Sequence, residues 1–356
     1  MSASSVASEA ILRAAWISAQ VSLGGTALLL LCLFWMHARR TAIESRRRVL
    51  VARWRPTLAA IALGGATPPA AALPPLARRD RVLFLQEWIA IHEALDREAC
   101  RGFEALNRQL RIGAIARVML RKRRLPSRML GSVALGHVGD AQAWDALLSQ
   151  TASRNLALSL AAARALVRLD PERAVAALMP VIERREDWPQ TRIWPLLHAA
   201  GPHAVTDPLL AAIGHSKERA QARLVRLLPL ADTTRAAARL HRLLRASDSD
   251  WVIGACLGVV ESPTELPAIR RCCAHPRWHI RMLAAKALGR LGEAQDESLL
   301  VDMLRDREWW VRYRSAQALV ALPWMRREQA EAIRDAQADR YARDAMDQAI
   351  AERAYR

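Results

Sequence analysis

The sequence is poor in the residues that build β-sheets. Only three Phe and three Tyr occur among its 356 residues, and Trp supplies the other twelve aromatic side chains. Strands usually show alternating aromatic and β-branched residues, and this pattern is scarce along the chain. We therefore predict an all-α protein.

Cysteine and lysine are also scarce. The five cysteines are an odd number and fall in segments expected to be helical, which excludes a disulfide framework and predicts a reducing compartment. They are Cys32, Cys100, Cys256, Cys272 and Cys273. Lysine occurs only at positions 122, 217 and 286, among 53 basic residues in total. We attribute this bias to a GC-rich genome and derive no chemistry from it.

Motifs of known enzyme chemistry are missing. The sequence has no P-loop, no GxSxG nucleophile turn and no HExxH zinc motif. The densest set of metal-ligand side chains lies in RRCCAHPRWHI and comprises Cys272, Cys273, His275 and His279. Adjacent cysteines on a helix project about 100° apart, so they suit a shared metal poorly. We expect no metal and no cofactor, and keep a metal-dependent enzyme using this cluster as the alternative.

The sequence repeats itself. RMLGSVALGHVGDAQ starts at residue 128, and RMLAAKALGRLGEAQ starts at residue 281, with nine of fifteen positions identical. Ala-Leu pairs end at Leu135, Leu166, Leu288 and Leu319. Leu135 and Leu166 are 31 residues apart, and so are Leu288 and Leu319. A fixed period of this length predicts a repeat architecture.

Each clear copy reads as two helices. In DESLLVDMLRD the apolar residues fall at helical spacing, and the Ala-rich run VRYRSAQALVAL follows after a polar turn. Such a pair cannot bury its apolar stripe alone, whereas stacked pairs can. Degenerate copies are expected around Trp194, Leu224 and Leu257.

The late copies resemble HEAT repeats in their short bacterial form, also described as PBS-lyase-type repeats. The residues that carry the resemblance are Asp306, Val311, Arg312, Ala316, Ala318 and Leu319. The resemblance covers roughly residues 110–325. It implies a right-handed α-solenoid and a ladder in which Asp306 pairs with Arg312.

Some relatives of this kind are enzymes. Iron hydroxylases of HEAT type use paired His-Glu motifs, and this chain has one such pair, His92-Glu93, before the repeats. We see no feature that supports a bilin lyase. HEAT-like DNA glycosylases are soluble and basic along their groove. This chain differs in two ways, because it has a candidate membrane helix and little net charge on its repeats.

Residues 14–36 carry no charge and are long enough to span a bilayer. Trp16 lies near one end and Trp35 near the other, as interfacial aromatics do. A basic cluster follows at Arg39, Arg40, Arg46, Arg47 and Arg48. Positive charge stays inside, so we predict a single-pass protein of the bacterial inner membrane, with its N-terminus out and its repeats in the cytoplasm. The same arginines would attract anionic lipid.

The formal net charge of +18 is concentrated in two segments. Residues 39–55 and 105–128 together supply +14 of it, which leaves only +4 for the rest of the chain. A nucleic-acid groove on the repeats would need its charge there. We therefore do not expect a nucleic-acid partner, although a membrane-associated nucleic-acid binder using residues 121–124 remains a second alternative.

The predicted organisation has six parts. They are a short extracytoplasmic N-terminus (1–13), a transmembrane helix (14–36), a basic segment with a Pro-rich linker (37–79), two capping helices (80–125), HEAT-like repeats (126–325) and one C-terminal capping helix (326–356).

Tryptophan offers the best candidate contact with a partner. Trp309 and Trp310 are adjacent, so they point in different directions and one should be exposed, with Arg312 and Arg314 close by. The sequence thus predicts a non-enzymatic, membrane-anchored adaptor that binds another protein, and we expect that partner to be a membrane protein. An envelope or exopolysaccharide assembly is one setting, by analogy.

Overall fold

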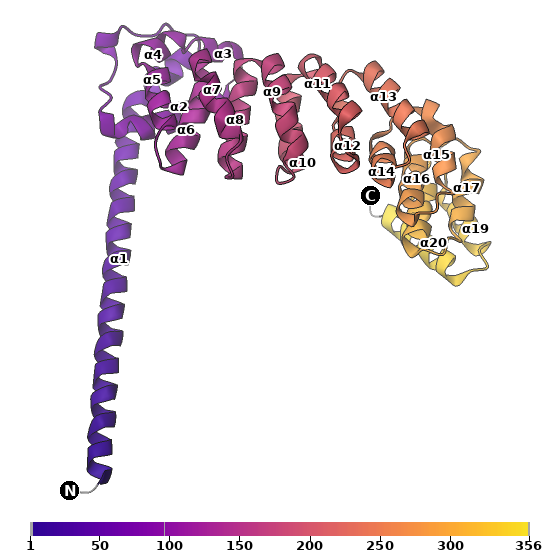
Figure 1. Ribbon diagram of the computed structural model, residues 1–356, viewed down its shortest axis with the longest axis horizontal. Coiled ribbons are helices and arrows are strands. Elements are labelled where there is room, and N and C mark those ends of the chain that lie inside the picture. The colour runs from indigo at the N-terminus through magenta and orange to yellow at the C-terminus, as the bar shows by residue number, and fades with distance from the viewer. Residues whose placement is uncertain (1–2, 96, 355–356) are drawn as a thin grey trace. The chain divides into compact units, whose positions relative to one another are not determined.

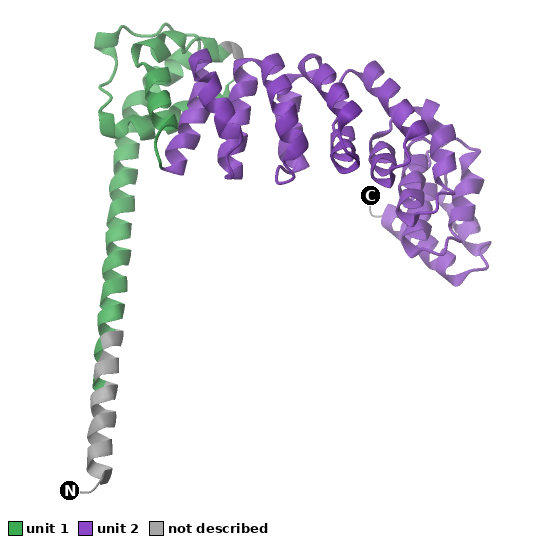
Figure 2. Ribbon diagram, viewed as in Figure 1, with its two compact units in different colours: residues 1–123 green, residues 124–356 purple. Residues whose placement is uncertain are grey.

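All regular secondary structure is helical in the part that a computed structural model describes, residues 3–95 and 97–354. This confirms the predicted all-α class (Figure 1). The chain divides into two compact units, residues 1–123 and residues 124–356 (Figure 2).

The first unit begins with one very long helix and continues with short ones. Its α-helices are α1 (Ala3–Ala62), α2 (Arg81–Ala94), α3 (Arg97–Arg101), α4 (Glu104–Gln109) and α5 (Ile112–Leu120). Two 3-10 turns, Ala70–Ala72 and Arg78–Asp80, lie in the Pro-rich stretch between α1 and α2.

The C-terminal part of α1 belongs to the core of the first unit. Its apolar stripe Leu50, Trp54, Leu58 and Ile61 is buried, and the Trp54 ring lies edge-on to Phe84 of α2 at 4.7 Å between centroids. This differs from the predicted basic segment and Pro-rich linker of residues 37–79, because the helix continues to Ala62 with Pro56 inside it. Burial of this stripe offsets the backbone hydrogen bond that proline cannot make.

Residues 80–125 form four helices where we predicted two. The segment between α4 and α5 turns at Arg111, whose φ of 53° is left-handed. A non-glycine residue in this conformation interrupts the α-helix, so the apolar run is divided between α4 and α5.

The second unit is a series of helix pairs. The first helices of the pairs are α7 (Trp144–Thr151), α9 (Pro171–Arg184), α11 (Pro202–His215), α13 (Thr233–Ala246), α15 (Leu266–Cys272), α17 (Asp296–Met303) and α19 (Arg327–Asp335). The second helices are α8 (Leu156–Leu169), α10 (Gln190–Ala200), α12 (Glu218–Val225), α14 (Asp250–Val259), α16 (Trp278–Leu291), α18 (Trp309–Ala321) and α20 (Arg340–Ala354), preceded by α6 (Leu125–Val138).

Local sequence signals set the helix boundaries. The Asp170 side chain accepts the N–H of Arg173 and caps α9, whose first residue is proline, and Asp232 caps α13 in the same way. Such caps satisfy N–H groups that a helix leaves unpaired at its start. Gly139, with φ of 74°, ends α6 in the left-handed conformation that glycine adopts freely.

The second helices pack against one another along the stack, with direct contact in the successive pairs α6–α8, α8–α10, α12–α14, α14–α16, α16–α18 and α18–α20. Within this unit they lie on the inner side of its curve, and the first helices lie on the outer side (Figure 1). We call the exposed surface of the second helices the inner face.

An arginine at the fourth position of a second helix holds the preceding turn. Arg281 donates to the backbone carbonyls of His275 and Pro276, and Arg312 donates to those of Asp306 and Arg307. Arg343 makes the same contacts one repeat later, with the carbonyls of Gln337 and Ala338. The C-terminal segment is therefore a further helix pair, α19–α20, where we predicted a single capping helix.

The ion pair between repeats differs from the predicted Asp306–Arg312 ladder. The Asp306 carboxylate accepts two hydrogen bonds, of 2.6 and 2.8 Å, from Arg281 of the preceding pair. Arg312 reaches only the backbone of Asp306. The ion pair thus joins two neighbouring repeats, whereas the predicted Asp306–Arg312 pair would lie within one repeat.

Candidate protein-binding surface

Aromatic side chains form a row along the inner face. They occupy the second residue of four successive second helices, and we call this set the aromatic row: Trp251, His279, Trp310 and Tyr341. The last three follow one another at the predicted repeat period. Trp251, Trp310 and Tyr341 are 54%, 49% and 61% exposed. Neighbouring helices pack about 10 Å apart, so the row presents an aromatic group at roughly that interval.

The predicted contact residues Trp309 and Trp310 lie at the start of α18, and both are about half exposed. The Trp309 ring stacks on Tyr313 with centroids 5.0 Å apart and an interplanar angle of 11°. Trp310 meets Trp309 edge-on at 4.7 Å. These contacts hold the two indoles in fixed positions while leaving part of each ring uncovered.

Arg312 and Arg314 have different surroundings. Arg312 holds the turn before α18 by donating to the backbone carbonyl of Asp306. Its guanidinium also lies 5.3 Å from the ring centre of Tyr341. Arg314 donates to the side-chain oxygen of Gln317 at 2.6 Å and lies 5.7 Å from the Tyr313 ring centre. Arg314 thus faces the next feature, a pocket on the inner face.

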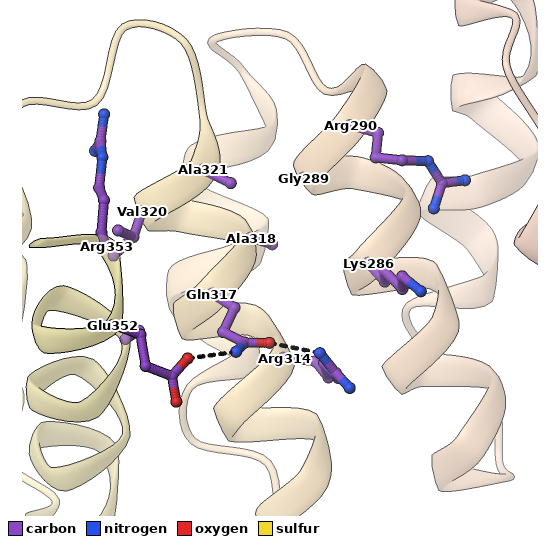
Figure 3. A pocket seen from close by; sticks show the side chains of 11 residues that line it. Lys286, Gly289, Arg290, Arg314, Gln317, Ala318, Val320, Ala321, Glu352 and Arg353 are labelled. Atoms are coloured by element: carbon purple, nitrogen blue, oxygen red, sulfur yellow. Dashed lines mark hydrogen bonds between the residues drawn. The ribbon is translucent and has the colours of Figure 1, made fainter. Parts of the chain in front are cut away.

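The pocket lies between α16, α18 and α20 and has a volume of about 540 Å³ (Figure 3). Small residues form its floor: Gly289, Ala318, Ala321 and Ala349. Basic residues surround them: Lys286, Arg290, Arg314 and Arg353. The single acidic residue of the lining is Glu352. We call this feature the basic pocket.

Neutral groups hold the arginines of the basic pocket in place. Arg290 donates to the backbone carbonyls of Leu257 and Val260, Arg353 donates to the carbonyl of Met325, and Arg314 donates to an amide (Figure 3). A carbonyl or an amide orients a guanidinium without cancelling its charge. The pocket therefore keeps a net positive field.

Glu352 is itself engaged. Its carboxylate accepts hydrogen bonds from the Tyr313 hydroxyl at 2.6 Å and from the Gln317 amide at 2.7 Å. The Tyr313 ring stacks on Trp309, so one network links the exposed tryptophans with the pocket.

Sequence reasoning missed the charge of the inner face. Together with α6, the second helices from α8 to α18 carry ten Arg or Lys residues besides the buried Arg281 and only two acidic ones, Glu218 and Asp250, whereas α20 carries three of each. The six first helices from α7 to α17 carry eight basic and seven acidic residues. A sum along the chain hides this separation. The spacing of four between Lys286 and Arg290, which places both on one side of a helix, is the signal that would have revealed it.

The four candidate metal ligands are not brought together. Cys272 and Cys273 are buried, His275 lies 3.6 Å from Asp250, and the His279 ring meets Trp278. Burial raises the pKa of the Cys273 thiol to about 12, so it stays protonated at neutral pH. Within residues 3–95 and 97–354, no group of three or more His, Cys, Asp or Glu side chains is placed to hold a metal ion.

The five arginines of the predicted lipid-proximal cluster all lie on α1 and are exposed: Arg39, Arg40, Arg46, Arg47 and Arg48. Arg39 lies 5.2 Å from the ring centre of Trp35, and Arg47 donates to Glu87 of α2 at 2.6 Å. The segment Leu23–Ala62 is, by length and composition, the one described helix apolar enough to cross a membrane. Residues 1–2 of the predicted extracytoplasmic part lie outside the described residues.

Comparison with known proteins identifies the repeats. The HEAT-repeat family model matches residues 251–320. No curated protein matches the chain. Among solved structures, the chain is similar to one in the complex of CpcE and CpcF of phycocyanin lyase from Nostoc sp. PCC7120, with 22% identity over 68% of this chain and 87% of that one, and a TM-score of 0.25. It is also similar to a designed armadillo repeat protein, with 13% identity over 67% and 98% of the two chains and a TM-score of 0.21.

The matched segment runs from Trp251 of α14 to Val320 of α18. Helix pairs continue on both sides of it. The chain is a HEAT-like repeat protein.

Proposed function

We propose that this protein is a membrane-anchored adaptor whose repeats bind another protein through the inner face. The observation that carries the proposal is the exposed aromatic row with its neighbour Trp309. Exposed aromatic side chains gathered on one surface mark interaction sites, and Trp and Tyr are enriched where binding energy concentrates. A solenoid presents such a surface over several repeats at once.

The anchor of the proposed adaptor is the N-terminal half of α1. Leu28, Leu29, Leu30, Leu31 and Phe34 are all more than half exposed, which suits lipid contact and would be costly in water. The basic cluster that follows favours a cytoplasmic location for the repeats and attraction to anionic lipid. The bacterial inner membrane, in an envelope or exopolysaccharide assembly, is the setting we propose by analogy.

The mechanism of such an adaptor is a raised local concentration. A protein held at the membrane meets a membrane partner by a confined search, so modest affinity suffices for stable association. No covalent chemistry is required of the repeats, and we propose a non-enzymatic role.

The test is a pull-down of the full chain from native membranes in mild detergent, with mass spectrometry of the proteins retained. We expect one stoichiometric partner, with at least tenfold weaker retention by the Trp310→Ala variant because a buried aromatic contact is worth about 2 kcal/mol or more. Trp324→Ala is the matched control, since Trp324 is 36% exposed but lies in the turn between α18 and α19, off the second helices. Absence of any stoichiometric partner would overturn the adaptor function. Equal retention by both variants would place the interface elsewhere.

A further inference from the structure

We propose that the basic pocket binds an acidic, extended segment of the partner protein, with the partner's carboxylates on Lys286, Arg290 and Arg314. This inference rests on the proposed adaptor function and names the chemistry of its ligand. It follows from the charge, the lining and the curvature of the inner face.

Charge points to an anion. Four basic side chains line the pocket, and its one carboxylate, Glu352, is occupied by Tyr313 and Gln317. The arginines are oriented in advance by carbonyl and amide groups, so binding a carboxylate would cost little further ordering. Arginine offers a planar fork that fits a carboxylate with two hydrogen bonds.

The lining points to a polypeptide. Gly289, Ala318, Ala321 and Ala349 leave space for small apolar side chains between the charged groups. No aromatic residue lines the pocket, whereas single-stranded nucleic acid needs aromatic platforms beside the cations that hold its phosphates. An acidic segment with alternating small apolar residues matches both parts of this lining.

The curvature disfavours a lipid surface as the ligand. Helices α16 and α20, which line the pocket, lie on the inner side of the curved stack (Figure 1). A flat bilayer would first meet the ends of this curve. An extended chain can follow the concave side from α16 to α20. Three helices about 10 Å apart span about 20 Å, which an extended segment of roughly six to eight residues covers.

Lysine chemistry allows a direct test on the full chain and its captured partner. A carbodiimide joins an amine to a carboxylate in contact with it, and the repeats contain only two lysines, Lys217 and Lys286. We expect cross-links from Lys286 to Asp or Glu of the partner, identified by mass spectrometry. Lys286→Arg should retain the partner but lose the cross-link, and Lys286→Glu should weaken retention about tenfold. Lys217→Glu, on an exposed residue outside the pocket, is the control.

A second measurement uses a defined probe, a fluorescent peptide of about eight residues with alternating Glu and Ala. We expect the full chain in detergent to bind it about tenfold more tightly than the matched Gln-Ala peptide, and Lys286→Glu to abolish this preference. Tighter binding of oligothymidine or of phosphatidylglycerol vesicles, lost in Lys286→Glu, would overturn the inference in favour of nucleic acid or lipid.

The outcomes separate the two proposals. A partner that is retained equally by Lys286→Glu and never cross-links at Lys286 would overturn the acidic-segment inference while leaving the adaptor function intact. A chain without any partner would overturn the adaptor function itself.

Discussion

Gly289 of α16 lies against Ala318 of α18 so closely that a methyl group on the glycine would be 2.8 Å from both the Cα and the Cβ of the alanine. The same relationship joins Gly136 of α6 to Ala165 of α8, where the distance to Cα would be 2.7 Å. Both glycines belong to the sequence segment that occurs twice in the chain. The repeated Ala-Leu-Gly therefore reflects the contact between two second helices.

Gly289→Ala should destabilise the protein by about 1–2 kcal/mol, because overpacking of this contact outweighs the gain of about 1 kcal/mol in helix propensity. Gly258→Ala is the control, since Gly258 lies in α14 with nothing within 4 Å of an added methyl group, and it should leave stability unchanged or raise it. Urea unfolding followed by circular dichroism measures both. If Gly289→Ala is as stable as Gly258→Ala, the close packing of α16 and α18 is wrong.

The ion pair between Arg281 and Asp306 should carry a measurable share of stability. Both side chains are about nine-tenths buried, and two hydrogen bonds join them. Breaking such a pair leaves a buried charge alone, so Arg281→Met should cost about 3 kcal/mol at neutral pH. Arg271→Met, on an exposed arginine of α15, should cost almost nothing.

The same pair predicts a pH dependence. Burial by itself would raise the pKa of Asp306, but hydrogen bonds from Arg281 and from the backbone of Glu308 outweigh it and hold that pKa below its ordinary value. A carboxyl group with a lowered pKa in the folded state contributes stability above about pH 4, and this contribution is lost as the pH falls through the lower folded value. The stability difference between wild type and Arg281→Met should therefore shrink between pH 5 and about pH 2. A difference that stays constant over this range would contradict the role of Asp306.

The fold could be predicted because its repeat is local. The repeat period, the Ala-Leu pairs and the turn residues are all visible within one or two units, and stacking follows from the apolar stripe that each unit exposes. The last helix pair was missed because α19 and α20 are rich in charged residues and Ala. Its signal is Arg343, one repeat after Arg312, which clamps the turn before α20.

The candidate site could not be predicted to the same extent, because it depends on which residues share a face. The basic residues of the inner face are spread over six helices from α6 to α18, and the acidic residues between them in the sequence lie mostly in the turns and on the first helices. Only stacking separates the two sets. Trp309 and Trp310 could be proposed from the sequence because their adjacency is visible in the chain, whereas Lys286, Arg290 and Arg353 line one pocket only through the contact of α16, α18 and α20.

Membrane attachment should depend on the exposed leucines of α1. An arginine near the centre of a spanning helix costs about 2.5–3.5 kcal/mol on an insertion scale, so the double variant Leu29→Arg with Leu31→Arg should leave the membrane fraction. Carbonate extraction followed by immunoblotting measures this. Arg46→Ala with Arg48→Ala, which leaves the apolar segment unchanged, should stay in the pellet. Retention of the leucine variant would exclude this segment as the anchor.

The C-terminal part of α1, which packs on α2, predicts where the chain can be truncated. Trp54 and Leu58 are buried with Phe84, Leu85 and Trp88 of α2, so a variant beginning at residue 40 should be soluble and folded without the membrane segment. A variant beginning at residue 80, at the predicted start of the capping helices, would expose these side chains, each worth about 1.5–3 kcal/mol when buried. It should aggregate or bind a hydrophobic dye during size-exclusion analysis. Trp54→Ala in the longer variant should lower stability by about 3–5 kcal/mol. If the two variants behave alike, the C-terminal part of α1 is a tether and contributes nothing to the core of the first unit.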